Sequence, residues 1–570
     1  MATYRPSITG SKHMISAGHY SAAHAGFQIL EAGGNAIDAG VAAGIALCVL
    51  QTDRVNFAGV APIMIYLASE RKVVNIDGLG TWPRAASIEY FRREHGGAMP
   101  PGILRTVMPA APAAWLKALE QYGTMSFGDV AQAAIRLTRD GFAMHEFMAE
   151  YLRDHEESYR KWPSSAAVFL PNGRPPRAGE LFVQKELSAT LQYMVDQEAA
   201  HRGKGRAAGL KAARDAFYRG DIAQKIAAYH RENGGWVTLD DLASYEVRFE
   251  PTVKAQFHGV EVHACGPWTQ GPMLPQALNV LSGYDLKAMG HNSVAYIHHL
   301  TEALKLAFAD RHRYYGDPKF VDVPLDVLLS PEYAAARRKL IRNDRAWPEM
   351  PPAGDVKDFP RATPLPEPTR GEPAPLADTS YACVIDRQGN AFSTTPSDGS
   401  SATPVIPGTG LCPSSRGSQS WTDPESPAAL APGKRPRLTP NPALALKDGK
   451  LFMPFGSPGN DIQPQAMLQV FLNVVVWGME PQEAVEAPRF ATFSFPSSSE
   501  PHNYHPGRLN LESRVERSTV DGLAALGHKV APWPEIEWRA GAVCAIRVND
   551  ETGLLEGGAD PRRPCYALGV

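Results

Sequence analysis

The sequence predicts a layered α/β or α+β protein with two β-sheets. Two observations indicate this class. Helical patterns dominate residues 109–345, whereas alternating apolar strands dominate the chain after residue 375. A segment with eight prolines, residues 351–375, separates the two regions and is too rich in proline for a helix or a central strand.

The first elements are two helices and a hairpin. Residues 16–50 form a helix, a stop at Gly33 and Gly34, and a second helix crowded with alanine and glycine, which we place in the interior. Residues 63–67 and 73–76 then alternate as the two strands of a hairpin across a polar turn.

The later elements follow from the same two periodicities. Helices are expected at residues 114–123, 127–142 and 292–318. After the proline-rich segment, strands are expected at 380–386, 391–397, 443–456 and 542–548, with one helix at 464–478.

Composition excludes several classes of function. The 570 residues are 44% apolar and 21% charged, with a net charge of -3, so neither nucleic acid nor an anionic membrane is indicated as a partner. Six scattered cysteines contain no CxxC pair, which argues against a zinc site or a disulfide framework. The first twenty residues lack the apolar segment of a secretory signal, so we expect a cytoplasmic location, or a periplasmic one if a signal was removed.

Thr379 stands where the proline-rich segment meets the first strand of the last region. A threonine hydroxyl is a poor nucleophile and needs a base. If the Asp378–Thr379 bond is cut, Thr379 gains an α-amino group whose reference pKa is about 7.7 to 8.0, so one residue supplies both nucleophile and base. On this stretch alone, an ordinary strand threonine is the commoner explanation.

Ten motifs that occur in one order favour the catalytic interpretation of Thr379. They are "ILEAGGNAIDAGVA", "YGTMSFGDVAQAAIRLTRDGF", "AFYRGDIAQKI", "NGGWVTLDDLASYE", "EALKLAFADRHRYYGDP", "DTSYACVIDRQGNAFSTT", "GKRPRLTPNPALALKDGK", "FGSPGND", "EAPRF" and "ADPRR". With these motifs the chain resembles the γ-glutamyltransferase family of N-terminal-nucleophile (Ntn) hydrolases.

The resemblance implies a four-layer αββα sandwich, made as one precursor and cut into a large subunit (1–378) and a small subunit (379–570). The two would form a heterodimer in one αββα domain, with further homo-oligomers possible. It implies amide hydrolysis or acyl transfer through an acyl-enzyme on an N-terminal threonine, with water or an amine as acceptor and without a cofactor or metal.

Four residues match the catalytic positions of the family. Thr379 matches the nucleophile, and Ser397 matches the hydroxyl that steadies it. Gly459 and Asn460, in "GSPGN", match the two N–H donors of the oxyanion hole in the family's "GSPGG". Such donors are a large electrostatic contribution in acyl transfer.

The positions that bind the γ-glutamyl head group depart from the family. Leu79 stands where the family's arginine binds the α-carboxylate, and Gly399 stands where an asparagine binds the α-amino group. The acidic "NNxMDDF"-like segment is replaced by "LCPSSRGSQSW", and the family's two serines are Leu438 and Thr439. We therefore expect weak activity on glutathione and a substrate other than a typical γ-glutamyl compound.

The substituted pocket would need its own substrate-binding groups. Thr439 keeps a hydroxyl at one of the serine positions. Arg84, Arg416 and Arg437 are the candidate carboxylate-binding residues, since arginine can bind a carboxylate with two hydrogen bonds.

Four alternatives stay open. One is a true γ-glutamyltransferase or glutathione hydrolase with a rearranged pocket, and another is an uncleaved, non-catalytic binding homologue. A metal hydrolase could use His298, His299, Glu302 and His312, although no HExxH motif occurs. A serine hydrolase could use the Ser-rich segment after residue 398, although no GxSxG motif occurs.

Overall fold

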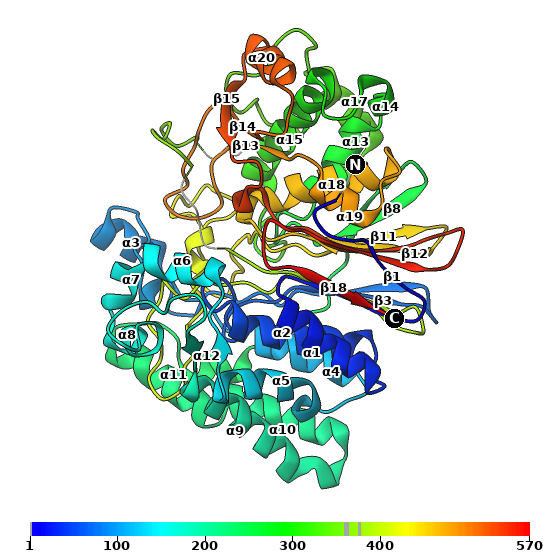
Figure 1. Cartoon of the computed structure of the whole chain (residues 1–570). Helices are drawn as coiled ribbons and strands as arrows, with labels where there is room; N and C mark the ends of the chain where they lie inside the picture. Colours follow the sequence, from blue (N-terminus) through cyan, green and yellow to red (C-terminus); the bar gives the residue numbers. More distant parts are fainter. Residues whose placement is uncertain (1–2, 358–363, 374–377) are drawn as a thin grey trace.

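A computed structural model of the chain describes residues 3–357, 364–373 and 378–570. Two antiparallel sheets lie face to face, and helices cover both outer faces (Figure 1). This is the expected four-layer αββα sandwich. Among the described helices, none combines the length and apolarity of a membrane span.

The first sheet has seven strands and is antiparallel throughout. Its strands, in spatial order, are β1 (Ile8–Gly10), β17 (Leu555–Ala559), β16 (Cys544–Val548), β12 (Lys450–Gly456), β11 (Ala443–Lys447), β8 (Val260–Ala264) and β7 (Val253–Phe257). Helices α13 (Met273–Leu281), α15 (Val294–Tyr314), α18 (Gln463–Val475) and α19 (Pro481–Glu486) lie on its outer side (Figure 1).

The second sheet has six antiparallel strands and carries the candidate site at one end. Its strands, in spatial order, are β18 (Tyr566–Gly569), β2 (Met14–Ala17), β9 (Ala382–Ile385), β10 (Ala391–Thr394), β3 (Ile63–Leu67) and β4 (Lys72–Ile76). Helices α1 (Tyr20–Glu31) and α2 (Ala36–Leu50) cover its outer face (Figure 1). Every residue of α2 is buried, as expected for the small-residue helix.

The remaining elements extend the outer layers. Beyond α1 and α2 lie α4 (Ala111–Tyr122), α5 (Phe127–Arg139), α9 (Lys185–His201), α10 (Arg206–Tyr218), α11 (Asp221–Glu232) and α12 (Leu239–Ser244). Shorter helices are α3 (Ile88–His95), α6 (Glu146–Asp154), α7 (Glu156–Arg160), α8 (Pro163–Phe169), α14 (Leu286–Met289), α16 (Leu325–Leu328), α17 (Pro331–Arg338) and α20 (Arg517–Ala525). Two small sheets consist of β13 (Phe490–Thr492), β14 (Arg508–Glu512) and β15 (Lys529–Trp533), and of β5 (Phe142–Ala143) and β6 (Leu181–Phe182).

Two apolar cores hold the layers together. One packs α1, α2, α4 and α5 against the six-stranded sheet, and the other packs α13, α15 and α18 against the seven-stranded sheet. Burial of apolar surface on this scale is the main stabilising term in such a layered fold.

Most of the expected helices and strands are present. The hairpin of β7 and β8 and the small sheet of β5 and β6 lie in the region where helical patterns dominate the sequence, and α19 and α20 join α18 where a single helix was expected. The additional strands β1, β2, β13, β14, β15, β17 and β18 were not expected either. The described parts of the proline-rich segment contain neither helix nor strand, as expected, but they are tethered: Gly354 N donates to Asp310, and Thr369 N donates to the carbonyl of Tyr504. Residues 358–363 and 374–377 lie outside the described residues.

Candidate active site

Thr379 lies at the end of the six-stranded sheet, directly after Asp378. Its side chain is buried, and its backbone pairs in an isolated antiparallel bridge with Ser397, which follows β10. The N–H of Ser397 also donates to the carbonyl of Val60 at 2.9 Å. The sheet therefore fixes Thr379 and Ser397 opposite each other.

A directional hydrogen-bond chain connects the two hydroxyls to the carbonyl of Asp378. The oxygen atoms Thr379 Oγ1 and Ser397 Oγ are 2.7 Å apart, and Ser397 Oγ donates to the Asp378 carbonyl oxygen at 2.9 Å. Because a serine hydroxyl has only one proton, Thr379 must be the donor to Ser397. The nucleophile candidate thus points its proton away from the adjacent carbonyl.

Arg416 reaches the same carbonyl from the start of a 3-10 helix, Arg416–Gln419. Its Nη2 donates to the Asp378 carbonyl oxygen at 3.0 Å and to Ser397 Oγ. The carboxylate of Asp398 lies 4.0 Å from Arg416 Nε, and it accepts hydrogen bonds from Ser415 N at 3.0 Å and Ser415 Oγ at 2.7 Å. Burial lowers the pKa of Arg416 and raises the pKa of Asp398, each opposed by the charge of the other.

Gly459 and Asn460 form the turn between β12 and α18. Both have positive φ, 117° and 53°, a conformation that glycine and asparagine adopt more readily than other residues. The next helix begins with Gln463, whose Nε2 donates to Thr379 Oγ1 at 3.4 Å. This contact brings the "GSPGN" turn to the nucleophile candidate.

Two glutamines that the sequence analysis did not single out join Thr439 to Asn460. Gln419 Nε2 donates to Thr439 Oγ1 at 3.1 Å and to Asn460 Oδ1 at 3.2 Å. Gln270 Nε2 donates to the backbone carbonyls of the same two residues, at 3.0 and 2.8 Å. Thr439 is therefore part of the buried wall that supports the turn.

Two arginines also missed by the sequence analysis bind the side chain of Asp378. Arg54 Nη1 and Arg563 Nη2 lie 2.8 and 2.7 Å from Asp378 Oδ2. Arg563 belongs to the "ADPRR" motif, so a signal for it existed in the sequence, whereas nothing in the local sequence marked Arg54.

The other two arginine candidates lie elsewhere. Arg437 is buried beside Arg311 and donates to Ser498 Oγ at 2.9 Å, and burial, with the neighbouring Arg311 charge, lowers its pKa to about 9. The side chain of Arg84 is 64% exposed and donates to Ser244 Oγ at 2.8 Å, so the structure does not bring it to Thr379.

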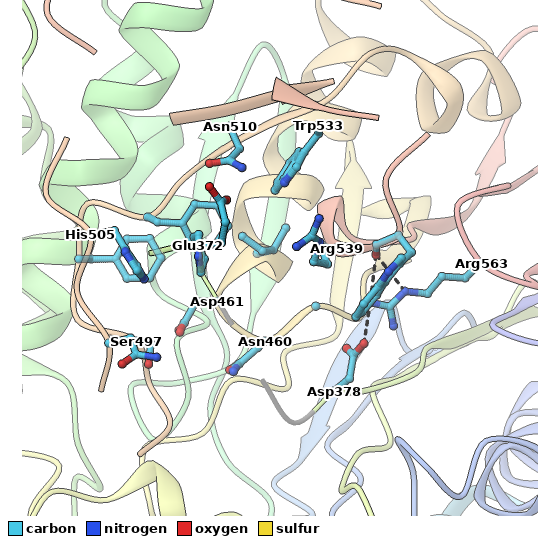
Figure 2. A pocket seen from close by; sticks show the side chains of 17 residues that line it. Glu372, Asp378, Asn460, Asp461, Ser497, His505, Asn510, Trp533, Arg539 and Arg563 are labelled. Carbon is cyan, nitrogen blue, oxygen red and sulfur yellow. Dashed lines mark hydrogen bonds and ion pairs between the residues drawn. The ribbon is translucent and has the colours of Figure 1, made fainter. Parts of the chain in front are cut away.

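A cavity of about 80 Å³ lies beside Asp378 (Figure 2). Asp378 and Arg563 line one side, and Gly459 and Asn460 line another. The remaining wall is rich in aromatic side chains, namely Phe493, Phe495, Trp533 and Trp538. Polar and charged side chains, among them Glu372, Asp461 and Arg539, also line the cavity, so it can offer both apolar contacts and hydrogen bonds to a small molecule.

The side chains that suggested a metal hydrolase contact other groups of the protein. His298 Nδ1 lies 2.9 Å from His528 Nε2, and its Nε2 lies 2.7 Å from the carbonyl of Arg342. Glu302, which completes a buried group with these two histidines, pairs with Lys305 at 2.8 Å. His312 lies apart from them, against the ring of Trp421.

The comparisons with known proteins agree with this architecture. Residues 22–570 match the family model described as gamma-glutamyltranspeptidase. The chain is 32% identical to the acylase ACY 1 proenzyme of Pseudomonas sp. (strain SE83), over 97% of this chain and 92% of the relative. It is 31% identical to the glutathione hydrolase-like YwrD proenzyme of Bacillus subtilis (strain 168), over 99% of both chains.

A solved structure agrees over the full length. LmbA2991HD superposes with a TM-score of 0.93 and 34% identity, covering 100% of both chains. The family match over nearly the whole sequence and these relatives lead to one conclusion. The chain belongs to the γ-glutamyltranspeptidase family of Ntn hydrolases and acylases.

Proposed function

We propose that this chain is the precursor of an amidohydrolase or acyltransferase that is activated by scission of the Asp378–Thr379 bond. The observation that carries the proposal is the pair of buried hydroxyls, Thr379 and Ser397, 2.7 Å apart beside that bond. The word proenzyme in the names of both relatives supports a cleaved precursor.

The first reaction is cleavage of the chain by its own threonine. Thr379 Oγ1 attacks the carbonyl carbon of Asp378, and the carbonyl electron pair moves to an oxygen that already accepts from Ser397 and Arg416. The C–N bond then breaks and the nitrogen takes the hydroxyl proton. Water hydrolyses the resulting ester, which leaves a carboxylate on Asp378 and a free amine on Thr379.

In this scheme Arg416 has a role that the sequence analysis did not anticipate. It was considered as a binder of a substrate carboxylate, but its hydrogen bonds go to the scissile carbonyl and to Ser397. A charged donor in a buried site stabilises developing negative charge more strongly than a neutral donor. We therefore assign it to stabilising the oxyanion of chain cleavage.

The second reaction uses the new amine. The α-amino group of Thr379 takes the hydroxyl proton while the oxygen bonds to the carbonyl carbon of a substrate amide. The N–H groups of Gly459 and Asn460 face the developing oxyanion. The C–N bond of the amide breaks, its nitrogen leaves as an amine with that proton, and water or an amine acceptor removes the acyl group.

Three positions support an acyl group other than γ-glutamyl. Leu79 and Leu438 are buried apolar residues where the family has polar ones. A Cβ atom at Gly399 would lie 2.8 Å from the carbonyl oxygen of Asp53, so the family's asparagine would not fit without movement. The acylase relative also points to amide substrates beyond glutathione.

The test begins with the state of the chain. Denaturing electrophoresis and intact mass of the purified protein should show two chains, with the small one starting at Thr379. Thr379→Ala should stay a single chain and should not hydrolyse any amide that the wild type hydrolyses. A wild type that remains a single chain would favour the non-catalytic binding homologue.

An amide screen on the matured protein then separates the two enzymatic candidates. We expect turnover of simple acyl anilides and little turnover of γ-glutamyl anilide or glutathione. A preference for γ-glutamyl substrates would favour a true γ-glutamyltransferase with a rearranged pocket. Equal turnover by Thr379→Ala and wild type would rule out Thr379 as the nucleophile.

A further inference from the structure

The carboxylate of Asp378 occupies a built anion site. Its Oδ2 atom lies 2.8 Å from Arg54 Nη1 and 2.7 Å from Arg563 Nη2. All three side chains are at most 5% exposed. Two converging guanidinium groups on one oxygen are a strong, charge-assisted arrangement for a carboxylate.

Aromatic rings hold the two guanidinium groups independently of Asp378. The Arg54 guanidinium carbon lies 4.0 Å from the ring centre of Phe147 and 4.9 Å from those of Tyr151 and Trp538. The Arg563 guanidinium lies 5.4 Å from the rings of Phe147 and Trp538. These cation–π contacts keep both arginines in place when their anion leaves.

The charges of this cluster balance only while Asp378 is present. Arg54 Nε lies 2.9 Å from Asp53 Oδ2, so the buried cluster contains two arginines and two aspartates. Chain cleavage turns Asp378 into the end of the large subunit. When that end moves out, two arginines face one aspartate, and an unbalanced buried cation strongly favours binding of an anion.

The site that Asp378 would vacate opens on the substrate cavity. Asp378, Arg563 and Trp538 line the cavity together with Gly459 and Asn460 (Figure 2). An acyl group whose carbonyl meets those N–H donors could therefore place a carboxylate between Arg54 and Arg563.

We propose that Arg54 and Arg563 bind a carboxylate on the acyl group of the substrate, and that the enzyme prefers amides of short dicarboxylic acids. The inference rests on the proposed function, because it needs Thr379 to be freed and to form an acyl-enzyme. The chain's own cleavage site sets the length, because both carbonyl carbons bond to the same Thr379 Oγ1 although their oxygens meet different donors. In Asp378 two carbons separate the reacting carbonyl from the side-chain carboxylate, which is the spacing of a succinyl group.

The first experiment uses matched substrates on the wild-type, matured protein. Succinyl and butyryl p-nitroanilides have the same chain length and differ only in a carboxylate replacing a methyl group. We expect kcat/KM at least about 50-fold higher for the succinyl compound, mostly through KM, because two charged hydrogen bonds are lost with butyryl. Oxalyl and glutaryl anilides, shorter and longer, should be weaker than succinyl. Equal turnover of succinyl and butyryl compounds would overturn the inference.

The second experiment removes the arginines. In Arg54→Met and Arg563→Met, rates are expressed per cleaved chain, measured by intact mass, because both residues also bind the cleavage segment. Succinyl anilide should lose at least about 30-fold in kcat/KM while butyryl anilide changes less than about 3-fold. Arg563→Lys should recover part of the loss, and Arg136→Met, on the exposed face of α5, should behave as wild type. A succinyl preference that survives both substitutions would contradict the assignment.

A third measurement covers the case in which the arginine variants do not mature. On the wild type, succinate should inhibit anilide hydrolysis competitively and butyrate at the same concentration should not; equal inhibition by both would count against the subsite.

Failure of this inference and failure of the proposed function give different results. Thr379-dependent amide hydrolysis without a carboxylate preference defeats this inference alone, whereas an uncleaved and inactive wild type defeats the proposed function and the inference with it.

Discussion

Arg416 is the residue for which the sequence and the structure suggest different roles. An arginine in a segment that lacks the family's acidic residues suggested a partner for a substrate carboxylate. The structure surrounds it with the Asp378 carbonyl, Ser397 and Asp398, in a buried position with little space for a further anion. Asp398 already balances the charge of Arg416, whereas Arg54 and Arg563 would lose one of their two aspartate partners if Asp378 moved away after the proposed cleavage.

We predict that Arg416→Met slows chain cleavage by about 100-fold, because loss of one oxyanion donor typically costs 10²–10³ in rate. Arg416→Lys should be intermediate, since it keeps the charge but not the geometry of the guanidinium. The measurement is the fraction of two-chain protein over time on denaturing gels. Arg84→Met, at an exposed arginine, should cleave like the wild type. Circular dichroism must show native helix content in each variant, and an unchanged cleavage rate for Arg416→Met would contradict the role.

The site residues that the sequence could identify share one property. Thr379, Ser397, Gly459 and Asn460 each stand in a local motif, and the structure places them around one bond and one turn. The residues it could not identify act across long distances in sequence. Arg563 stands in the "ADPRR" motif and Arg54 stands in none; because most of the chain separates them, no local pattern indicates that both will reach Asp378. Such contacts exist only after the two sheets have assembled.

At the scale of elements, the sequence was informative where one periodicity extends over many residues. α1, α2, α5, α15 and the hairpin of β3 and β4 were expected within a few residues of their observed bounds. The hairpin of β7 and β8 was missed although β7 alternates between buried and exposed residues, because five residues among many helices give a weak signal. Helix α20 is short and contains Gly522, which lowers its intrinsic propensity.

The contact of α2 with the six-stranded sheet depends on one glycine. A Cβ atom at Gly40 would lie 2.1 Å from Cδ1 of Phe392, a buried residue of β10. β10 leads directly to Ser397, so this contact supports the strand that positions Thr379 and Ser397, the proposed catalytic pair.

We predict that Gly40→Ala lowers the free energy of unfolding by about 1 to 3 kcal/mol, the usual effect of overpacking a core. Urea denaturation followed by fluorescence measures the change. Gly203→Ala is the matched control, because a Cβ atom there has no neighbour within 4 Å. If the clash with Phe392 is the cause, Phe392→Leu should be less damaging in the Gly40→Ala background than alone. Equal midpoints for Gly40→Ala and Gly203→Ala would refute the packing argument.

At the scale of the whole molecule, the two proposed subunits are interleaved. Strands from before and after Thr379 contribute to both central sheets, so cutting the chain there would not separate two domains. The fold can therefore lose one peptide bond and keep its core, while the new chain ends gain freedom only near the cavity. This allows an activation step that changes the chemistry of one residue without rebuilding the protein.

The same dense core predicts how stability depends on pH. Burial lowers the pKa of His145 and His502 to about 4, of His230 to about 3 and of His528 to about 2. Each is protonated in the unfolded chain below its reference pKa of about 6.5 but stays neutral in the folded protein. The unfolded state therefore binds more protons between pH 6.5 and 4, and stability falls as the pH is lowered through that window.

Buried acids act in the opposite direction, since burial also raises the pKa of Asp53, Asp77, Asp310, Asp398 and Glu500, but the histidines whose pKa is lowered by burial are more numerous. Burial raises the pKa of Asp53 and Asp77 to about 6. Below pH 6 these two carboxylates therefore bind protons more readily in the folded protein than in the unfolded chain. Each histidine with a folded pKa near 4 should lower the free energy of unfolding by roughly 3 kcal/mol at pH 4, at about 1.4 kcal/mol per pKa unit.

We expect the urea midpoints of the single-chain Thr379→Ala variant to fall steadily from pH 7.5 to pH 5. His230→Gln should bind about one proton fewer on unfolding near pH 5.5, because this histidine's pKa is shifted by burial alone. Urea midpoints that stay level or rise over this range would contradict the prediction. They would mean that these histidines are solvated or charged in the folded protein rather than buried and neutral.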